Sequence, residues 1–348
     1  MLYGANGYTG TLTAYLAQAR GLLPILAGRN QVKLEALGTR LGLQVRVFDL
    51  RDPATLRRQL SGVQAVLHMA GPFTSTSAPL LDACLDTGCH YLDITGEYSV
   101  FESIWRRHHE AKKAGSVILP GVGFDVVPTD CLAALLQRGL PDATELELAF
   151  ATLGTRPSPG TVNTWIEALG CGGLVRIGGE IVPEPLGARA RDIPFPTRTL
   201  HSVAVPIGDL SSAFRTTGIP TITAYMALPK PGQLGLRGLA ALRGVFAHSR
   251  VARGLKRWVP RAVQGPDASE RSRSRGELWG EVRNAAGKRF SLTLTTPDPY
   301  ALTADAALRA VERVLAGRVA PGASTPAQAL GADFIAECDG VWVSSTTP

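Results

Sequence analysis

The chain begins with three glycines at a spacing that suits phosphate binding. In YGANGYTG, Gly4, Gly7 and Gly10 recur every third residue, where a short apolar run gives way to a helical pattern. The first glycine permits a tight turn, the second lets backbone approach a pyrophosphate, and the third lets the helix pack closely. Free N–H groups at a helix N-terminus also attract phosphate. The pattern predicts a dinucleotide-binding turn, with a purely structural turn as the alternative.

The residues after the second strand pattern favour NADP(H) over NAD. At this position NAD sites usually carry Asp or Glu, which accepts hydrogen bonds from the ribose. Here the chain reads Ala27-Gly28-Arg29, without a carboxylate. Arg29 can form a paired, charge-assisted hydrogen bond with a 2′-phosphate, and Lys33, one turn into the next helix, adds a second charge. The alternative is that Arg29 is a solvated loop residue.

Residues after the third and fourth strand patterns extend the candidate cofactor site. Ligands of doubly wound sheets bind beyond the carboxyl ends of the strands. Asp49 ends the third strand and is expected on the adenine side of the cofactor. Ala70, Gly71 and Phe73 follow the fourth strand, where the ribose and nicotinamide usually lie. We therefore expect these four residues to contact the cofactor.

Three further polar residues are candidates for catalysis, because they follow the fifth and sixth strand patterns. Tyr98 is expected to donate a proton, and Asp125 to act as an acid or an orienting group, with Asp93 as the third candidate. Asp93 and Asp125 could instead accept backbone N–H groups in turns, and Tyr98 could be a core aromatic residue. The five scattered cysteines predict reduced thiols and no metal site.

Alternating strand and helix patterns over the first 128 residues predict how these side chains are positioned. They indicate an α/β fold, with an N-terminal Rossmann doubly wound parallel sheet over 1–128 that binds NADP(H). A second α+β domain over 129–300, with a mainly antiparallel sheet, is expected to hold the substrate and to dimerise. A C-terminal helix and tail over 301–348 should pack back on the Rossmann domain. The first strand is short, which suggests that the sequence is truncated there.

Several element limits follow from the same patterns. Helices are predicted over 78–87, over 100–114 as one piece, and over 303–316. In the second half, strands are predicted over 144–151, 202–207, 221–228, 277–283 and 289–296. The segment 265–277, which has few apolar residues, is predicted to be a mobile exposed loop.

Composition indicates a globular cytoplasmic protein with one basic segment. The 348 residues are 45% hydrophobic and 19% charged, and no stretch has the length of a membrane span or the form of a signal peptide. Of the net charge of +7, residues 234–275 contribute ten Arg or Lys against Asp267 and Glu270. This basic segment fits an acidic carrier protein or an anionic membrane surface, so the protein could be peripheral to a membrane. Nucleic acid is not expected, because no recognition motif accompanies the charge.

The motifs YGANGYTG, LAGRN, AGPF, HYLDITGE and PGVGFDVVPTD together resemble the saccharopine dehydrogenase-like oxidoreductases. The second half, with GTVNTWIEAL and YALTADAAL, is more similar to the subgroup that includes trans-acting enoyl reductases. The resemblance implies a reduced nicotinamide cofactor, NADP(H), and a second domain that often forms a homodimer. It also implies a set of cofactor contacts: Gly4, Asn6, Gly7, Tyr8, Thr9, Gly10, Arg29, Asp49, Ala70, Gly71 and Phe73.

Three functions remain open at the level of sequence. The first is an NADP(H)-dependent reductase that acts on a C=C (enoyl), C=O or C=N bond of a lipid-like or thioester substrate, small or carrier-bound. The second is a saccharopine-type amino-acid dehydrogenase, for which Arg156, Arg176 and Arg215 could bind the carboxylates. The third is a non-catalytic nucleotide-binding scaffold.

The basic segment yields a first testable prediction. A helix is predicted over 236–258, and Arg243, Arg250 and Arg257 recur every seven residues on one of its faces. If that face binds anionic lipid, changing all three to Glu should abolish sedimentation with anionic liposomes at low salt, because exposed charges attract only while salt does not screen them. Equal sedimentation of the native and changed proteins would contradict lipid binding by this face.

Overall fold

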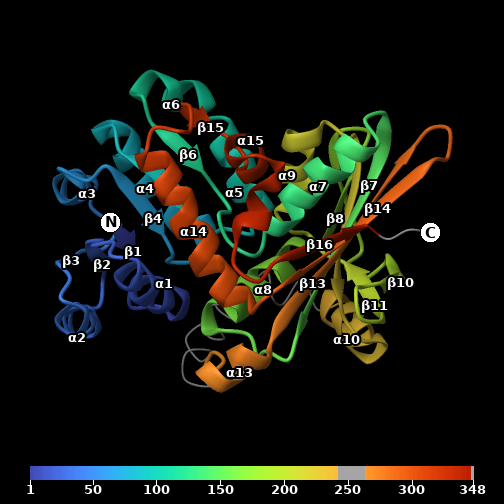
Figure 1. The fold of residues 1–348 in the computed structure, drawn as a ribbon, viewed down its shortest axis with the longest axis horizontal. Coiled ribbons are helices and arrows are strands. Elements are labelled where there is room, and N and C mark those ends of the chain that lie inside the picture. Colours follow the sequence, from blue (N-terminus) through green and yellow to red (C-terminus); the bar gives the residue numbers. More distant parts are fainter. Residues whose placement is uncertain (242–262, 346–348) are drawn as a thin grey trace. The chain divides into compact units, whose positions relative to one another are not determined.

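A computed structural model describes residues 1–241 and 263–345 (Figure 1). Contacts within the chain divide it into two compact units. Unit 1 comprises Met1–Thr95, Ser99–Val127 and Tyr300–Gly331, so a segment from the end of the sequence returns to the N-terminal part. Unit 2 comprises Gly96–Tyr98, Pro128–Pro299 and Ala332–Pro348. No helix of the described residues is long and apolar enough to cross a membrane.

Unit 1 is built on a parallel sheet of seven strands in the order β15-β6-β5-β4-β1-β2-β3. Its strands are β1 (Leu2–Tyr3), β2 (Leu26–Gly28), β3 (Val45–Val47), β4 (Ala65–His68), β5 (His90–Asp93), β6 (Val117–Leu119) and β15 (Gly322–Ala323). The order on either side of β1 is that of a doubly wound Rossmann sheet, which confirms the predicted fold class. Figure 1 shows β15, from the end of the chain, beside β6.

Helices connect the parallel strands of unit 1, as crossover connections require. They are α1 (Tyr8–Ala19), α2 (Gln31–Leu41), α3 (Pro53–Leu60), α4 (Phe73–Thr87), α5 (Tyr98–Trp105), α6 (His108–Ala114), α14 (Pro299–Leu315) and α15 (Pro326–Leu330). Two limits differ from prediction. The single helix expected over 100–114 is broken at Arg107, whose guanidinium bonds Asp82 and Glu110. Helix α4 begins five residues early, because Ser75 and Thr76 bond the Pro72 carbonyl in its first turn.

The first strand is central although it has only two residues. Leu2 pairs with Leu26 of β2 on one side and with Leu67 of β4 on the other. Leu2 and Tyr3 are almost completely buried, because they are enclosed between both neighbouring strands and the helices that cover the sheet. The carboxyl end of β1 therefore lies between those of β2 and β4, where the glycine turn begins.

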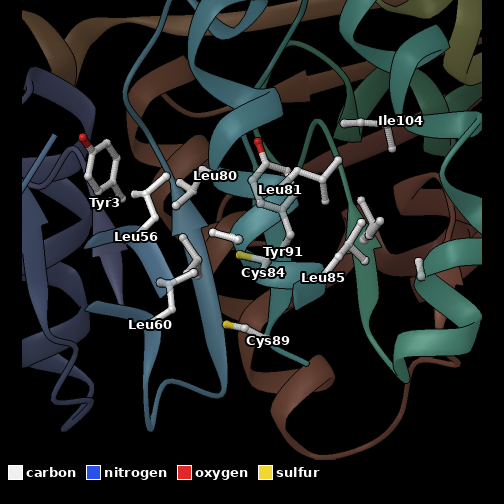
Figure 2. Packing of buried hydrophobic residues seen from close by; sticks show 14 of the residues in the cluster. Tyr3, Leu56, Leu60, Leu80, Leu81, Cys84, Leu85, Cys89, Tyr91 and Ile104 are labelled. Carbon is white, nitrogen blue, oxygen red and sulfur yellow. The ribbon is translucent and has the colours of Figure 1, made fainter. Parts of the chain in front are cut away.

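An apolar cluster fills the interior of unit 1. Figure 2 shows leucines of α3 and α4, among them Leu56 and Leu80, packed beside Tyr3 and Tyr91 of the sheet. Burying a side chain of this size stabilises a fold by about 1.5–3 kcal/mol. Cys84 and Cys89 lie in the same cluster as free thiols. The rings of Tyr3 and Tyr91 thus bring hydroxyl groups into an apolar region, and each hydroxyl needs a partner there.

Unit 2 is built on a mixed, mostly antiparallel sheet with the main order β10-β11-β12-β7-β13-β14-β16. Its strands are β7 (Ala143–Leu153), β8 (Gly173–Ile177), β9 (Glu180–Glu184), β10 (Ala190–Pro194), β11 (Thr199–Ala204), β12 (Thr221–Ala227), β13 (Arg275–Asn284), β14 (Arg289–Thr296) and β16 (Trp342–Ser345). The mainly antiparallel character is as predicted, with one exception, since β12 pairs with β7 in parallel. The strands β8, β9, β10 and β16 were not predicted.

Within residues 1–241 and 263–345, unit 2 has the helices α7 (Val127–Gly139), α8 (Pro159–Cys171), α9 (Asp209–Thr217), α10 (Lys230–Ala241), α13 (Ala268–Arg273) and the 3-10 turn η1 (Ala332–Glu337). Helix α7 packs so closely on β13 that a Cβ on Gly280 would lie 2.6 Å from Leu136. The predicted mobile loop over 265–277 contains α13. A capping box forms that helix, with Asp267 accepting from the Glu270 N–H at 2.9 Å and the Glu270 carboxylate accepting from the Asp267 N–H at 3.0 Å.

Candidate functional site

The glycine turn after β1 leaves no room for side chains at two positions. Gly4 has a φ of +88°, and a Cβ on it would lie 2.8 Å from the carbonyl carbon of Met69. A Cβ on Gly10 would collide with the carbonyl oxygen of Gly4. Both residues must therefore be glycine for α1 to start directly above the end of β1. Gly7, between them, is exposed and donates its N–H to the Gly4 carbonyl at 2.9 Å.

The N-terminus of α1 meets the requirements of a phosphate site. Among the described residues, no side chain caps this end, where Gly7 is the N-cap residue. The first N–H groups of an uncapped helix point outward and carry partial positive charge. Asn6, Tyr8 and Thr9 are all partly exposed around this end. The Asn6 side-chain oxygen lies over Gly28 at the end of β2, 3.0 Å from where a Cβ would be.

Basic side chains gather after β2 and β3. Arg29 and Lys33 are both exposed, and Lys33 lies in the first turn of α2. Asp49 accepts hydrogen bonds from Arg51, from the backbone N–H at 3.0 Å and from Nε at 2.8 Å. These bonds are the main reason that the pKa of Asp49 is lowered, and the charge of Arg29 lowers it further. Arg51 therefore compensates the charge of Asp49, a role that sequence reasoning missed although the residues are two apart.

His68, the last residue of β4, contacts the loop that follows this strand. The His68 Nε2 atom lies 3.2 Å from the Ala70 carbonyl oxygen, to which Thr76 also donates its hydroxyl at 2.7 Å. The ring of Phe73 packs edge-on to the His68 ring, with centroids 5.0 Å apart. Gly71, between these two anchored residues, is exposed. Sequence reasoning missed His68, whose signal was one ionisable residue at the end of an apolar strand.

Asp93 is buried inside unit 1 and bonded at both carboxylate oxygens. Its Oδ1 accepts the N–H groups of Thr95 and Gly121, each at 3.0 Å, and its Oδ2 lies 2.8 Å from the Tyr91 hydroxyl. Burial raises its pKa to about 6, although these three hydrogen bonds oppose the shift. Asp93 has no exposed surface in this structure. Its two backbone N–H bonds are those expected of the alternative to catalysis, a turn acceptor.

Asp125 has the opposite environment. It is exposed, and within the part of the chain that the structure describes its carboxylate has no hydrogen-bond partner. Although water reaches this side chain, enough protein surrounds it to raise its pKa to about 6 by desolvation. The preceding residue, Phe124, donates its N–H to the Thr303 hydroxyl of α14 at 3.0 Å. A segment from the end of the chain thus fixes the loop that carries Asp125.

Tyr98 is the first residue of α5 and is half-buried. It belongs to the short segment Gly96–Tyr98 of unit 2, whose Gly96 carbonyl accepts the N–H of Gly208 at 2.8 Å. Asp93 and Asp125, in contrast, both belong to unit 1. The three predicted catalytic residues therefore do not form one cluster within a single unit.

The raised pKa of Asp93 predicts a stability change with pH. An acid whose pKa is higher in the folded protein stabilises the fold below its unfolded value, here 3.8, and loses that contribution as pH rises through about 6. Relative to Asp93→Asn, the native protein should therefore lose about 2–3 kcal/mol of unfolding free energy between pH 4 and pH 7. Chemical unfolding at both pH values measures this difference.

His68, whose pKa burial lowers to about 3, acts in the opposite direction, so only the comparison between variants isolates Asp93. Asp86→Asn removes a carboxylate from an exposed ion pair with Arg57 and serves as the control. The control should keep the pH dependence of the native protein. Parallel curves for the native protein and Asp93→Asn would show that folding does not raise the pKa of Asp93.

Comparison with known proteins identifies the N-terminal part. Residues 1–119 match the family model described as the saccharopine dehydrogenase NADP binding domain. The fold is similar to that of saccharopine dehydrogenase (L-Glu forming) from Saccharomyces cerevisiae, with a TM-score of 0.70 and 14% identity over 99% of each chain. At that identity the likeness concerns the fold.

Curated relatives extend the similarity to the whole chain. A trans-acting enoyl reductase of Mycobacterium ulcerans is 29% identical over 408 aligned residues, which cover 99% of this chain and 97% of that protein. The trans-acting enoyl reductase of Mycobacterium leprae is 35% identical over 183 residues, about half of this chain and 44% of that protein. Residues 1–119 thus match a saccharopine dehydrogenase-type NADP-binding domain, and the chain that carries them is an NADP-binding oxidoreductase that resembles the saccharopine dehydrogenase-like proteins.

Proposed function

We propose that the protein uses NADPH to reduce the C=C bond of an enoyl thioester. The observation that carries this proposal is the similarity to the Mycobacterium ulcerans trans-acting enoyl reductase over almost the full length of both chains. Similarity confined to a nucleotide-binding domain would suggest only a shared cofactor. Here it also includes unit 2, the part of the chain that we expect to bind the substrate.

The residues of unit 1 fit a phosphorylated dinucleotide. The pyrophosphate would lie at the uncapped N-terminus of α1, against the backbone of Gly7. Arg29 and Lys33 would hold the 2′-phosphate, and Ala70, Gly71 and Phe73 would border the nicotinamide. When bound, NADPH supplies the hydride that reduces the β carbon. The chain must then hold the substrate and deliver a proton to the α carbon.

Asp125 is the residue that we assign to proton donation. Its carboxyl group is exposed and has no hydrogen-bond partner among the described residues, so it can approach a substrate. A pKa of about 6 keeps part of the Asp125 population protonated near neutral pH.

Two of the three arginines proposed for a saccharopine-type substrate, Arg156 and Arg176, already have partners in unit 2. Arg156 forms an ion pair with Glu270 at 2.7 Å. Arg176 is buried, donates to the carbonyl oxygens of Leu210 and Gly179, and lies over the Phe214 ring at 4.2 Å. A substrate with several carboxylates would have to displace these partners. This arrangement favours a substrate with little negative charge at the reacting end.

The basic segment 234–275 supports a carrier-bound substrate. A thioester on an acidic carrier protein would bring negative charge to the ten basic residues of this segment. Residues 242–262, which include Arg243, Arg250 and Arg257, lie outside the described residues. In the described part, Arg237 of α10 donates from Nε to the Gly187 carbonyl at 3.0 Å.

Arg29→Ala should weaken NADPH binding and leave NADH binding unchanged. Losing hydrogen bonds to a phosphate costs about 1.5–3 kcal/mol, or roughly a tenfold to hundredfold change in affinity. Titration followed by nicotinamide fluorescence measures both affinities. Arg57→Ala, which removes an exposed arginine paired with Asp86, controls for the general loss of positive charge. Equal binding of NADPH and NADH by the native protein would contradict the role of Arg29.

Asp125→Asn should lower turnover of an enoyl thioester by about 10²–10⁴-fold while NADPH affinity changes little. In the native protein, turnover should fall as pH rises through about 6, because only the protonated acid donates. Asp125→Glu, which retains an acid, should retain this pH dependence. The measurement is the loss of NADPH absorbance with enoyl thioesters of coenzyme A, from short to long chains.

The same assay separates the other functions. NADPH oxidation with glutamate and a semialdehyde, but not with enoyl thioesters, would establish the amino-acid dehydrogenase instead. Tight NADPH binding without oxidation by either substrate class would indicate a scaffold. Full activity of Asp125→Asn with an enoyl thioester would leave the reaction intact and move proton donation to another residue.

A further inference from the structure

Three ionisable side chains form a line through the interior of unit 1. Asp93 at the end of β5 lies 2.8 Å from the Tyr91 hydroxyl, which lies 3.0 Å from Nδ1 of His68. The other ring nitrogen of His68 lies 3.2 Å from the carbonyl oxygen of Ala70. All three side chains are fully buried. The line leads from the deepest carboxyl group of the sheet to the loop that we assign to the nicotinamide.

Only a few placements of the hydrogen atoms give every hydrogen bond in this line one donor and one acceptor. A carbonyl oxygen only accepts, so His68 bonds Ala70 only if Nε2 carries the hydrogen. In a neutral ring Nδ1 is then an acceptor, and Tyr91 must donate its single hydroxyl hydrogen to it. Tyr91 can then only accept from Asp93, which must be protonated. The alternative, a positively charged His68, is opposed by burial, which lowers the pKa of His68 to about 3.

When Asp93 is ionised, the arrangement that keeps both hydrogen bonds of Tyr91 is the reverse one. Tyr91 then donates to Asp93, and its oxygen accepts a hydrogen from Nδ1 of His68. The Nε2 atom of the neutral ring carries no hydrogen, so two lone pairs face each other between His68 and the Ala70 carbonyl. Each proton has moved by one position: from Asp93 to Tyr91, from Tyr91 to Nδ1, and from Nε2 to water.

We propose that Asp93, Tyr91 and His68 form a buried proton-sharing chain, and that loss of one proton from it withdraws the hydrogen bond that positions the Ala70 carbonyl. These three are positioning residues, because all of them are fully buried and reach the proposed nicotinamide loop only through Ala70 and Phe73. Phe73 belongs to the same unit of structure, because its ring packs edge-on against His68. The evidence for the proton-sharing chain consists of contacts within unit 1. Only its effect on NADPH binding rests on the proposed function.

Among the residues that the structure describes, few charged groups near the proton-sharing chain could shift its protonation. Tyr3 of β1, next to His68, has its pKa raised to about 12 by burial and stays protonated. On the side of α4, burial raises the pKa of the Cys84 thiol, and a hydrogen bond from Cys84 lowers that of Cys89. On the side of β6, Asp93 meets the backbone N–H of Gly121. Among the described residues, no charged side chain adds to the pKa shift of Asp93 or of His68.

The test reads the His68 ring directly in the full-length protein without cofactor. Histidine labelled with ¹⁵N reports by NMR which ring nitrogen carries the hydrogen, and His68→Gln assigns the signal. From about pH 5 to about pH 8, the native ring should change from the Nε2–H to the Nδ1–H form while it stays neutral. Asp93→Asn should remain Nε2–H throughout, because its amide donates to Tyr91 as the protonated acid does. Tyr91→Phe should remove the pH dependence by cutting the chain.

Asp125→Asn is the matched control, since it removes an acid of similar pKa that lies outside the chain. In Asp125→Asn, the pH midpoint of the His68 tautomer change should equal that of the native protein. A ring that keeps one tautomer at every pH in the native protein, or that changes equally in Asp93→Asn, would overturn the proposal.

The link to the cofactor loop needs a second measurement. NADPH affinity of the native protein should weaken roughly tenfold over the pH range in which the tautomer changes, as expected for one lost hydrogen bond. Asp93→Asn should show no such weakening. A tautomer change with constant NADPH affinity would overturn the coupling to the loop. Because the tautomer is read without cofactor or substrate, the result is independent of whether enoyl reduction is the reaction.

Discussion

The close contact between helix α1 and the Gly4 turn is the constraint on which unit 1 depends. The backbone of Gly4 touches both Met69 after β4 and the N-terminal turn of α1, at distances that exclude a Cβ on Gly4 or Gly10. Its N–H also donates to the carbonyl of Ala27 in β2 at 2.8 Å. One turn therefore brings together the carboxyl ends of three strands and the positive end of a helix. A dinucleotide bound there would reach all of them.

Two carboxyl groups of unit 1 share a pKa of about 6 but differ in what they can do. Asp93 is enclosed and bonded by backbone N–H groups and by Tyr91, so its proton can move only along buried partners. Asp125 meets solvent, so its proton can pass to a bound substrate. The pKa alone would not separate these roles, because desolvation raises both. The two roles differ because solvent reaches Asp125 and not Asp93, and because, of the two, only Asp93 has hydrogen-bond partners among the described residues. Packing determines both differences.

Residues close in sequence made much of the fold predictable. The alternation of strand and helix patterns, the glycine spacing and the absence of a carboxylate beside Arg29 are local features, and they indicated the parallel sheet and the cofactor. The capping box of Asp267 and Glu270 was also local, yet the lack of apolar residues in that segment led to a predicted loop. Helix α13 forms because capping satisfies its end even though it buries little.

The sequence by itself determined the Rossmann unit, its phosphate turn and the preference for NADP(H), because each rests on residues within one or two neighbouring elements. Only the tertiary structure decided that β15 joins the edge of the sheet, that β12 runs parallel to β7, and that Thr303 of α14 holds the loop before Asp125. It also brought His68 beside Tyr91 and Asp93. These contacts join residues more than twenty positions apart, and their energies depend on burial that no local pattern encodes.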